Sequence, residues 1–223
     1  MYKTLLVNSE LRKSQYISSI EYWLKSTTLP IVFVENSNTD ISPYFKEAIV
    51  NQRLEILTFY GNDYPNYLGK GMGEMKCFEY AHAHSKFIAN ADFIFKVTGR
   101  HKILNFNKFL NAKEIKSCDV FADVIFNYTM VDSRFFGYTP IFFQKYLLPY
   151  KTYLNDSENR YFEHILARAL FKSLSDGLNF LPFMFSLRID GMSGTSNKKY
   201  NSSFISWFIK NSIKKLKFYL NNR

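Results

Sequence analysis

Cysteine is scarce in this chain, and so are the long apolar runs that a membrane-spanning protein needs. The two cysteines, Cys77 and Cys118, have neither the spacing of a metal site nor that of a disulfide framework, which suits a reducing compartment. No apolar run reaches the roughly 18 residues that a transmembrane helix requires. The opening residues MYKTLLVNSE also lack the apolar segment of a signal peptide. We therefore expect a protein that is made and kept in the cytoplasm.

Acidic residues are outnumbered. The chain has 19 Asp and Glu against 29 Lys and Arg, a formal net charge of +10. Such an excess predicts an anionic partner, which could be a nucleotide, a nucleic acid or a lipid headgroup. Hydrophobic residues make up 47% of the chain, which excludes disorder of the chain as a whole, and 223 residues are enough for one large domain.

Two nucleotide-binding motifs are absent. Gly69-Lys70 is followed by Gly71 rather than by Ser or Thr, so the glycine-rich stretch is not a P-loop. A dinucleotide-binding fingerprint belongs after the first strand, where the segment VNSELRKS contains no glycine. The same absence argues against a methyltransferase.

The first third of the chain alternates strand and helix patterns. Apolar runs at 4–7, 31–34 and 54–59 predict buried strands, and the segments 11–26 and 42–51 between them predict helices. Alternation of this kind is typical of a parallel sheet with helical crossovers. The predicted fold class is therefore α/β.

The segment from Leu68 to Lys102 is the centre of this prediction. Three closely spaced glycines open it, a helix with one apolar face follows, and the run 93–95 predicts a buried parallel strand. That strand leads into Lys96-Val97-Thr98-Gly99-Arg100. Ligands of open α/β sheets bind beyond the carboxyl ends of strands, so chemistry is expected here. Alternatively, the glycines only permit a tight loop into a helix, and the two cations only solvate a strand end.

The second half of the chain has a looser pattern. Short helices are predicted at 106–110, 113–117 and 140–148, and strands at 120–126, 128–136 (in mixed orientation) and 181–185. Asn155-Asp156 is expected to cap an amphipathic helix that runs through Leu174. The loop 190–196 could close over a bound diphosphate, or it could be an ordinary surface turn.

In this order, the elements resemble nucleotide-sugar glycosyltransferases of the GT-A fold, in which the second strand ends in V-D-D-G-S-x-D. Here that segment reads Val34-Glu35-Asn36-Ser37-Asn38-Thr39-Asp40. The family's next glycine-started helix matches 71–85, and its metal-binding strand matches 92–100. Its acidic helix start, which supplies the catalytic base, matches Asp156-Ser157-Glu158 and Glu163-His164. The chain is also similar to small bacterial capsule and lipopolysaccharide transferases with a G-K-G-x-G-E…K-x-T-G-R pattern.

The resemblance implies a mostly parallel, GT-A-like sheet flanked by helices and assigns roles to residues. The donor would be held by Glu35, Asn36, Asp40, Lys70, Gly71, Lys96, Thr98, Gly99 and Arg100. Asp132, Glu158 or Glu163 would deprotonate the acceptor, and Arg100 would take up the charge of the leaving group.

The chain departs from the family at the metal site. Thr98-Gly99-Arg100 stands where the family has D-x-D. Because a fixed arginine can bind phosphate oxygens in a bidentate manner, Lys96 and Arg100 are expected to replace a divalent metal. We therefore expect no metal ion and no cofactor other than the donor substrate. His82 and His84, two residues apart on a helix, point to different sides and are poor joint metal ligands.

A basic amphipathic helix is predicted at 203–220, so the expected division is a catalytic domain over 1–202 and this helix over 203–223. Its isoleucines form one stripe, and lysines cover much of the remaining surface. This composition is typical of a helix lying in the plane of an anionic membrane surface. The alternative is a helix docked on the catalytic domain with a solvated basic side.

Together these observations predict a glycosyltransferase that moves a sugar from a nucleotide-sugar to a saccharide acceptor. The acceptor is expected to be lipid-linked, and the protein is expected to be peripheral to the inner face of the cytoplasmic membrane. The expected setting is bacterial capsule or lipopolysaccharide synthesis. The rival hypothesis is a non-enzymatic, basic nucleic-acid-binding protein. Against it, the positive charge is spread along the chain rather than gathered in one stripe.

Overall fold

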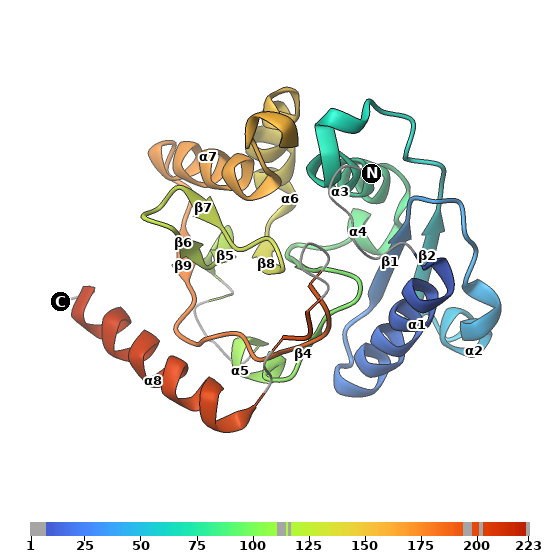
Figure 1. The fold of residues 1–223 in the computed structure, drawn as a ribbon, viewed down its shortest axis with the longest axis horizontal. Coiled ribbons are helices and arrows are strands. Elements are labelled where there is room, and N and C mark those ends of the chain that lie inside the picture. Colours follow the sequence, from blue (N-terminus) through green and yellow to red (C-terminus); the bar gives the residue numbers. More distant parts are fainter. Residues whose placement is uncertain (1–7, 111–114, 116, 194–197, 201–202, 222–223) are drawn as a thin grey trace.

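The chain folds as a mixed α/β protein whose strands form several small sheets (Figure 1). The computed structural model describes residues 8–110, 115, 117–193, 198–200 and 203–221. The expected α/β class is confirmed. The expected mostly parallel sheet is not seen among the described residues, where two strand pairs are parallel and four are antiparallel. The predicted strand 4–7 and most of the predicted helix 113–117 lie outside the described residues.

The predicted parallel pair is present. β1 (Ile31–Glu35) and β2 (Leu54–Thr58) run parallel, in a register that pairs Ile31 with Leu54. A 3₁₀ turn η1 (Ser42–Phe45) and the short helix α2 (Lys46–Val50) connect them. Helix α1 (Ser9–Ser26) is capped by the Asn8 side chain and covers this unit. The small core between these elements is formed by Ile20, Phe33, Ile41, Phe45 and Leu54.

The central sheet has the strand order β3, β8, β5, β9. β3 (Ile94–Val97) and β5 (Val120–Ala122) are both antiparallel to β8 (Phe135–Tyr138), and β9 (Phe180–Pro182) is parallel to β5. The prediction that β3 is a parallel strand was wrong. The hairpin of β6 (Val124–Ile125) and β7 (Met130–Val131) reverses the chain after β5 and brings β8 back between β5 and β3. The single strands predicted at 120–126 and 128–136 were wrong, since each segment forms two separate strands. The expectation that the second segment joins a sheet of mixed orientation is confirmed.

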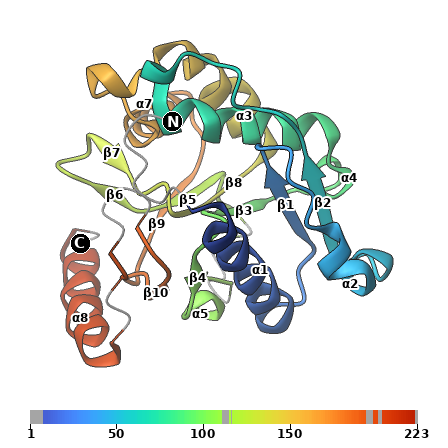
Figure 2. The same cartoon turned by 45° about the vertical axis from the view of Figure 1, so that its right-hand side comes forward.

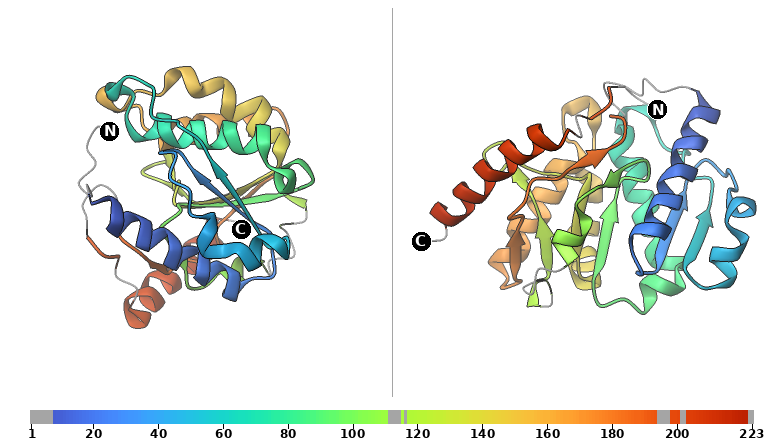
Figure 3. Two further views of the ribbon diagram at one scale, coloured as in Figure 1. Left: turned by 90° about the vertical axis from the view of Figure 1, so that its right-hand side faces the viewer. Right: turned by 90° about the horizontal axis from the view of Figure 1, so that it is seen from below.

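Both faces of the central sheet are buried. Phe135 and Phe136 are adjacent and fully buried, and they belong to different cores because successive side chains of a strand point to opposite faces. Phe136 faces α3 (Gly69–His84) and α7 (Phe162–Ser175), whereas Phe135 faces α5 (Phe106–Leu110). Figures 2 and 3 show this layering, with α3 and α7 on one side of the strands and α1 and α5 on the other.

Gly137 of β8 stands at a position where a side chain would collide with a neighbouring ring. A Cβ at Gly137 would lie 2.4 Å from the ring of Phe93. The Phe93 ring therefore covers the strand at this residue. Across the strand pair, Gly137 stands opposite Phe95. The abundance of aromatic residues noted in the sequence serves this packing, since rings stack or meet edge to face on both sides of the sheet.

The remaining elements are mostly short. They are η2 (Asn66–Leu68), α4 (Lys86–Ala89), β4 (Lys102–Ile103), the consecutive helical turns α6 (Pro140–Phe142), η4 (Phe143–Leu147) and η5 (Leu148–Tyr153), η6 (Asp156–Glu158), β10 (Ile189–Asp190) and the 18-residue helix α8 (Phe204–Asn221). Within the described part of the chain, no helix is both long and apolar enough to cross a membrane.

The prediction that Asn155-Asp156 caps the long helix was wrong. Asn155 instead caps the 3₁₀ turn η6, where its side chain accepts a hydrogen bond from the backbone N–H of Ser157. Asn159 then adopts a left-handed conformation, with φ of 58°, which ends that turn. α7 begins only at Phe162, and His164 accepts a hydrogen bond from the backbone N–H of Tyr161.

The three glycines lie inside the first turns of α3 rather than in a loop before it. Gly69 has a φ of +70°, and a Cβ there would lie 2.0 Å from a carboxylate oxygen of Asp156. A Cβ at Gly71 would lie 3.0 Å from the side chain of Leu154 and 3.2 Å from the backbone nitrogen of Phe162. Gly69 and Gly71 therefore allow the segment from Leu154 to Phe162 to approach the start of α3 closely.

Replacing Gly69 by alanine should destabilise the protein for two reasons. A left-handed conformation costs an L-residue about 1–2 kcal/mol, and the new methyl group must also displace Asp156. The matched control is Gly177→Ala, because Gly177 has a φ of +91° but nothing within 4 Å of an added Cβ. Urea denaturation should show a clearly larger loss for Gly69→Ala. Equal losses would mean that the contact with Asp156 does not matter.

Candidate functional site

Charged side chains from four elements meet beside the end of β3. We call the group formed by Lys70, Glu74, Lys96, Asp156 and Glu163 the charge cluster. Lys70 and Glu74 come from α3, Lys96 from β3, Asp156 from η6 and Glu163 from the first turn of α7. The structure thus brings together Lys70, Lys96 and Glu163, which the sequence analysis assigned to one site from separate parts of the chain.

Lys96 is held in place by three acceptors. Its ammonium group forms an ion pair with Glu74, donates to the backbone carbonyl of Ser133, and lies 3.3 Å from the hydroxyl of Thr98. An ammonium group has three protons to donate, so these contacts account for all of them. The role of Lys96 as a diphosphate ligand stays a prediction, but its charge is already balanced by Glu74.

Glu163 is connected to the same strand end through a serine. The Ser133 hydroxyl donates to a carboxylate oxygen of Glu163 over 2.6 Å, and the Ser133 carbonyl accepts from Lys96. Ser133 is buried, whereas Glu163 is half-buried. The carboxylate of Glu163 is therefore oriented by a buried group and remains partly accessible to solvent.

Asp156 lies at the amino terminus of α3 and is 8% exposed. One of its carboxylate oxygens accepts the backbone N–H of Lys70 at 2.9 Å, while the other has no hydrogen-bond partner among the described residues. Burial raises the pKa of Asp156, and the nearby charge of Glu163 raises it further, although the hydrogen bond from Lys70 opposes both. Because a carboxylate already occupies this helix end, a donor phosphate bound to the backbone of Lys70 and Gly71 would meet a like charge.

Burial also shifts the pKa values of Glu74 and Lys70. Desolvation raises the pKa of Glu74, because protein atoms crowd its carboxylate although 28% of its side-chain surface stays accessible. The positive charge of Lys96 opposes this rise in pKa. Desolvation lowers the pKa of Lys70, and the positive charge of Arg100 adds to the lowering, while Asp156 opposes it. Arg100 is thus close enough to act on the cluster electrostatically.

The turn that contains Thr98, Gly99 and Arg100 packs between the central sheet and the β1–β2 unit. The backbone N–H of His101 donates to the Thr98 carbonyl at 2.8 Å and closes the turn. A Cβ at Gly99 would lie 3.3 Å from the rings of Phe33 and Tyr16. The guanidinium of Arg100 lies 3.4 Å from the side-chain oxygen of Gln15, a neutral partner.

The start of the predicted closing loop lies against this turn. A Cβ at Gly191 would lie 3.0 Å from the carbonyl oxygen of Arg100, and the carbonyl of Met192 is 3.3 Å from the His101 ring. Residues 194–197 of this loop lie outside the described residues. Its closure over a donor stays a prediction, now with the loop's first residues placed next to Arg100.

The predicted nucleoside-binding turn is organised by Glu35. The buried carboxylate of Glu35 accepts hydrogen bonds from the backbone N–H groups of Ser37 and Thr39 and from the Ser37 hydroxyl, all between 2.7 and 2.9 Å. Asp40 accepts from the backbone and hydroxyl of Ser42. The Asn36 carbonyl accepts from Gly61 and from the Asn62 side chain. These bonds give Glu35 and Asp40 clear roles in shaping the turn, and their contact with a nucleoside stays a prediction.

Two of the three predicted bases are engaged elsewhere. Asp132 is buried and forms a bidentate pair with Arg134, at 2.8 and 2.6 Å, and also accepts the Arg134 backbone N–H. Glu158 is exposed and pairs with Arg160 at 2.9 Å. Of the three, Glu163 is the one that belongs to the charge cluster.

The sequence analysis gave Glu74 no role, although it is the glutamate of the G-K-G-x-G-E pattern. It stands four residues after Lys70, so both lie on one face of α3, and this spacing could have revealed it. Among the described residues, no group of three or more His, Cys, Asp or Glu side chains is arranged to hold a metal ion. A groove of about 640 Å³ lies elsewhere, on the solvent side of α7, and its lining includes Tyr128, Tyr150, Arg168 and Phe171.

Removing the charge of Asp156 should change how stability depends on pH. The pKa of Asp156 in the folded chain lies above its ordinary value of 3.8, so the folded state binds this proton more tightly than the unfolded state does. The wild type therefore loses stability as the pH rises through the raised pKa, and Asp156→Asn avoids that loss. Urea denaturation between about pH 4 and about pH 7 should show Asp156→Asn gaining stability relative to the wild type.

The matched control for this experiment is Glu158→Gln, which removes an exposed carboxylate from the same turn. This control should show a much weaker pH dependence relative to the wild type. A stability difference between Asp156→Asn and the wild type that falls as pH rises would contradict the prediction, because the helix terminus would then be stabilising the carboxylate more than burial disfavours it.

Replacing Glu35 by alanine should lower stability. The substitution leaves the donors of Ser37 and Thr39 without their acceptor. Because both residues are exposed, water replaces part of these bonds, and the expected loss is about 1–3 kcal/mol in total. Urea denaturation measures the loss, and Glu35→Gln, which keeps one acceptor oxygen, should lose less. Unchanged stability with weaker nucleotide-sugar binding would instead assign Glu35 to the ligand.

Comparison of the chain with protein-family models, with curated proteins and with solved structures found no match. Functional conclusions about this protein therefore depend on its residues and their geometry.

Proposed function

We propose that this protein is a glycosyltransferase that moves a sugar from a nucleotide-sugar donor to a saccharide acceptor. The observation that carries the proposal is that the charges of Arg100 and Glu163 both act on Lys70 beside the end of β3. This pairing of cations with a half-buried carboxylate suits a transfer in which a diphosphate leaves and a hydroxyl attacks. The motif pattern of capsule and lipopolysaccharide transferases supports a lipid-linked acceptor and a GT-A-like ancestry of the fold.

The proposed reaction has one bond forming and one breaking. The acceptor hydroxyl oxygen bonds to the anomeric carbon, while the bond from that carbon to the diphosphate oxygen breaks and its electron pair stays on the diphosphate. Glu163 takes the hydroxyl proton. Arg100 stabilises the charge that develops on the leaving diphosphate, because its guanidinium can bind two phosphate oxygens at once.

Glu163 is the preferred base among the carboxylates. Asp132 is already bonded to Arg134, and the Asp156 oxygen that has no partner among the described residues is buried beyond the reach of an acceptor. Glu163 is half-buried and oriented by Ser133. Asp156 then has a positioning role, in which it fixes the amino terminus of α3 and with it Lys70.

Donor binding should not require a divalent metal. The described strand end carries Lys96 and Arg100 in place of an acidic pair, so the diphosphate charge meets a protein cation. Calorimetry with a panel of nucleotide-sugars should give the same donor affinity with and without EDTA. Binding that is lost on chelation and restored by Mn²⁺ would contradict this expectation.

Arg100→Ala should lower turnover about 10²-fold or more, the scale of losing one preorganised stabilising donor. Arg100→Lys should recover only part of the activity, because lysine lacks the bidentate fork. Arg168→Ala is the matched control, since Arg168 is exposed and its guanidinium lies over the Tyr153 ring on the outer side of α7. Tight binding of mixed-sequence nucleic acid without any nucleotide-sugar binding would favour the rival function.

A further inference from the structure

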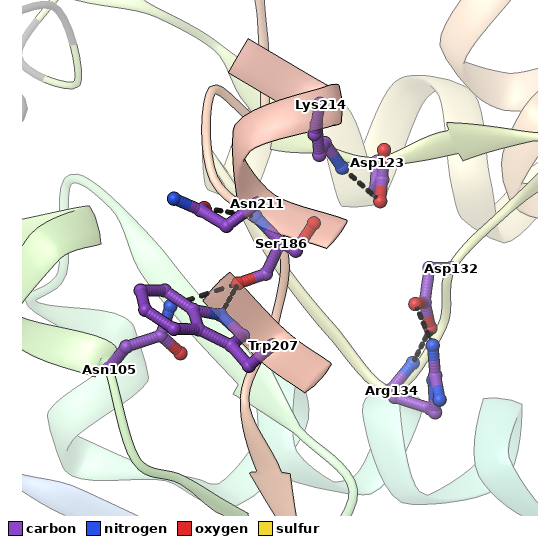
Figure 4. Close-up of polar contacts among 8 residues, drawn as sticks. All are labelled: Asn105, Asp123, Asp132, Arg134, Ser186, Trp207, Asn211 and Lys214. Atoms are coloured by element: carbon purple, nitrogen blue, oxygen red, sulfur yellow. Dashed lines mark hydrogen bonds and ion pairs between the residues drawn. The ribbon is translucent and has the colours of Figure 1, made fainter. Parts of the chain in front are cut away.

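Helix α8 is attached to the rest of the protein by its more polar face (Figure 4). Trp207 donates its indole N–H to the Ser186 carbonyl at 2.7 Å, and the Asn211 side chain accepts the Ser186 backbone N–H at 3.0 Å. Lys214 forms an ion pair with Asp123. These three residues recur at intervals of four and three, so they lie on one face of the helix. α8 is therefore fixed in rotation about its own axis.

The opposite face of α8 is apolar and points to solvent. Ile205, Ile209, Ile213 and Leu216 are 73%, 56%, 52% and 62% exposed, respectively. Their spacing of four, four and three places them in one stripe along the helix, which we call the apolar stripe. All views show α8 at the periphery of the molecule, so this stripe forms part of an outer surface (Figures 1 and 3).

This orientation differs from the docked helix that the sequence analysis gave as the alternative to a membrane-surface helix. A helix docked on the body was expected to bury its apolar side and to leave a basic side in water. The structure shows a docked helix with the reverse orientation. Burying an exposed Ile or Leu side chain contributes about 1.5–3 kcal/mol, so four side chains in one stripe are a substantial driving force for binding another apolar surface.

The charges on α8 distinguish between possible partners. The helix contains Lys210, Lys214, Lys215 and Lys217 and no acidic residue. Lys210 is exposed at one border of the apolar stripe, and Lys215 lies near the other with its ammonium over the Phe185 ring. If two copies of α8 paired through this stripe, lysines would face lysines with no carboxylate on either helix to balance them. An anionic lipid surface supplies the missing negative charge.

We propose that α8 is a pre-docked membrane-surface helix, which inserts its apolar stripe into the headgroup region of an anionic bilayer while its polar anchors stay on the protein. Lys210 at the border of the stripe contacts lipid phosphates. The helix lies in the plane of the membrane, as amphipathic helices with a basic border do. Because its rotation is fixed by Trp207, Asn211 and Lys214, the bilayer binds the whole molecule in one orientation. This proposal does not depend on the proposed sugar transfer.

The test is co-sedimentation of the full-length protein with vesicles. On vesicles of equal parts phosphatidylcholine and phosphatidylglycerol, the double variant Ile209→Ser/Ile213→Ser should partition at least about tenfold more weakly than the wild type. Lys210→Gln should reduce partitioning about fivefold on these vesicles and leave the weak binding to pure phosphatidylcholine unchanged. The matched control is Leu11→Ser/Val50→Ser, which removes two exposed apolar side chains outside α8 and should bind as the wild type does.

Circular dichroism and thermal melting should confirm that each variant is folded. This is the expected result because the substituted side chains are exposed. The proposal is overturned if the wild-type protein does not bind the anionic vesicles, or if the double variant binds them as well as the wild type does. It is also overturned if light scattering finds a dimer that the double variant abolishes and that does not bind vesicles, because the stripe would then serve a second copy.

Discussion

The carboxylate of Asp156, seated on the amino terminus of α3, is the contact on which the candidate site depends. It can reach the first turn of the helix only because Gly69 has no side chain and adopts a positive φ. The contact holds η6 against α3, and α7 with Glu163 begins four residues after that turn. The close contact between η6 and the start of α3 thus brings charged residues from distant parts of the sequence close enough to interact electrostatically.

The candidate site contains carboxylates as well as cations, so it is not a purely positive binding site for phosphate. Lys96 is neutralised by Glu74, and the charges of Asp156, Glu163 and Arg100 all act on Lys70. Near a protein surface such balanced clusters gain little from long-range attraction, but they gain much from hydrogen bonds of fixed geometry. A ligand binding here must exchange partners within an existing network, so affinity will depend on how well its oxygens replace the carboxylates that now lie beside the cations.

The sequence predicted the positions of helices and strands better than it predicted the direction of the strands and the hydrogen-bond partners of the side chains. The helix α1, the parallel pair β1–β2 and the helix α8 were found because their apolar periodicity is local. The direction of β3 was missed because a run such as Phe93-Ile94-Phe95 is buried whichever way its neighbour runs. The site was predicted in part. Lys70, Lys96 and Glu163 do converge, but Glu74 was given no role although it belongs to the G-K-G-x-G-E pattern. The internal bonds of Glu35 could not be read from a pattern that looked like a ligand-binding turn.

The buried strand β8 has a property that its composition conceals. When one face of a strand is apolar and the other polar, a slip of one residue is penalised because it exposes the apolar set. In β8, Phe135 and Phe136 are equally apolar and equally buried, so hydrophobicity gives almost no penalty for such a slip. The ring of Phe93 does penalise such a slip, because the strand residue beneath this ring must be Gly137, which has no side chain. The correct pairing of this strand is therefore encoded by an absent side chain, and a pairing error during folding would be rejected by collision rather than by exposure to water.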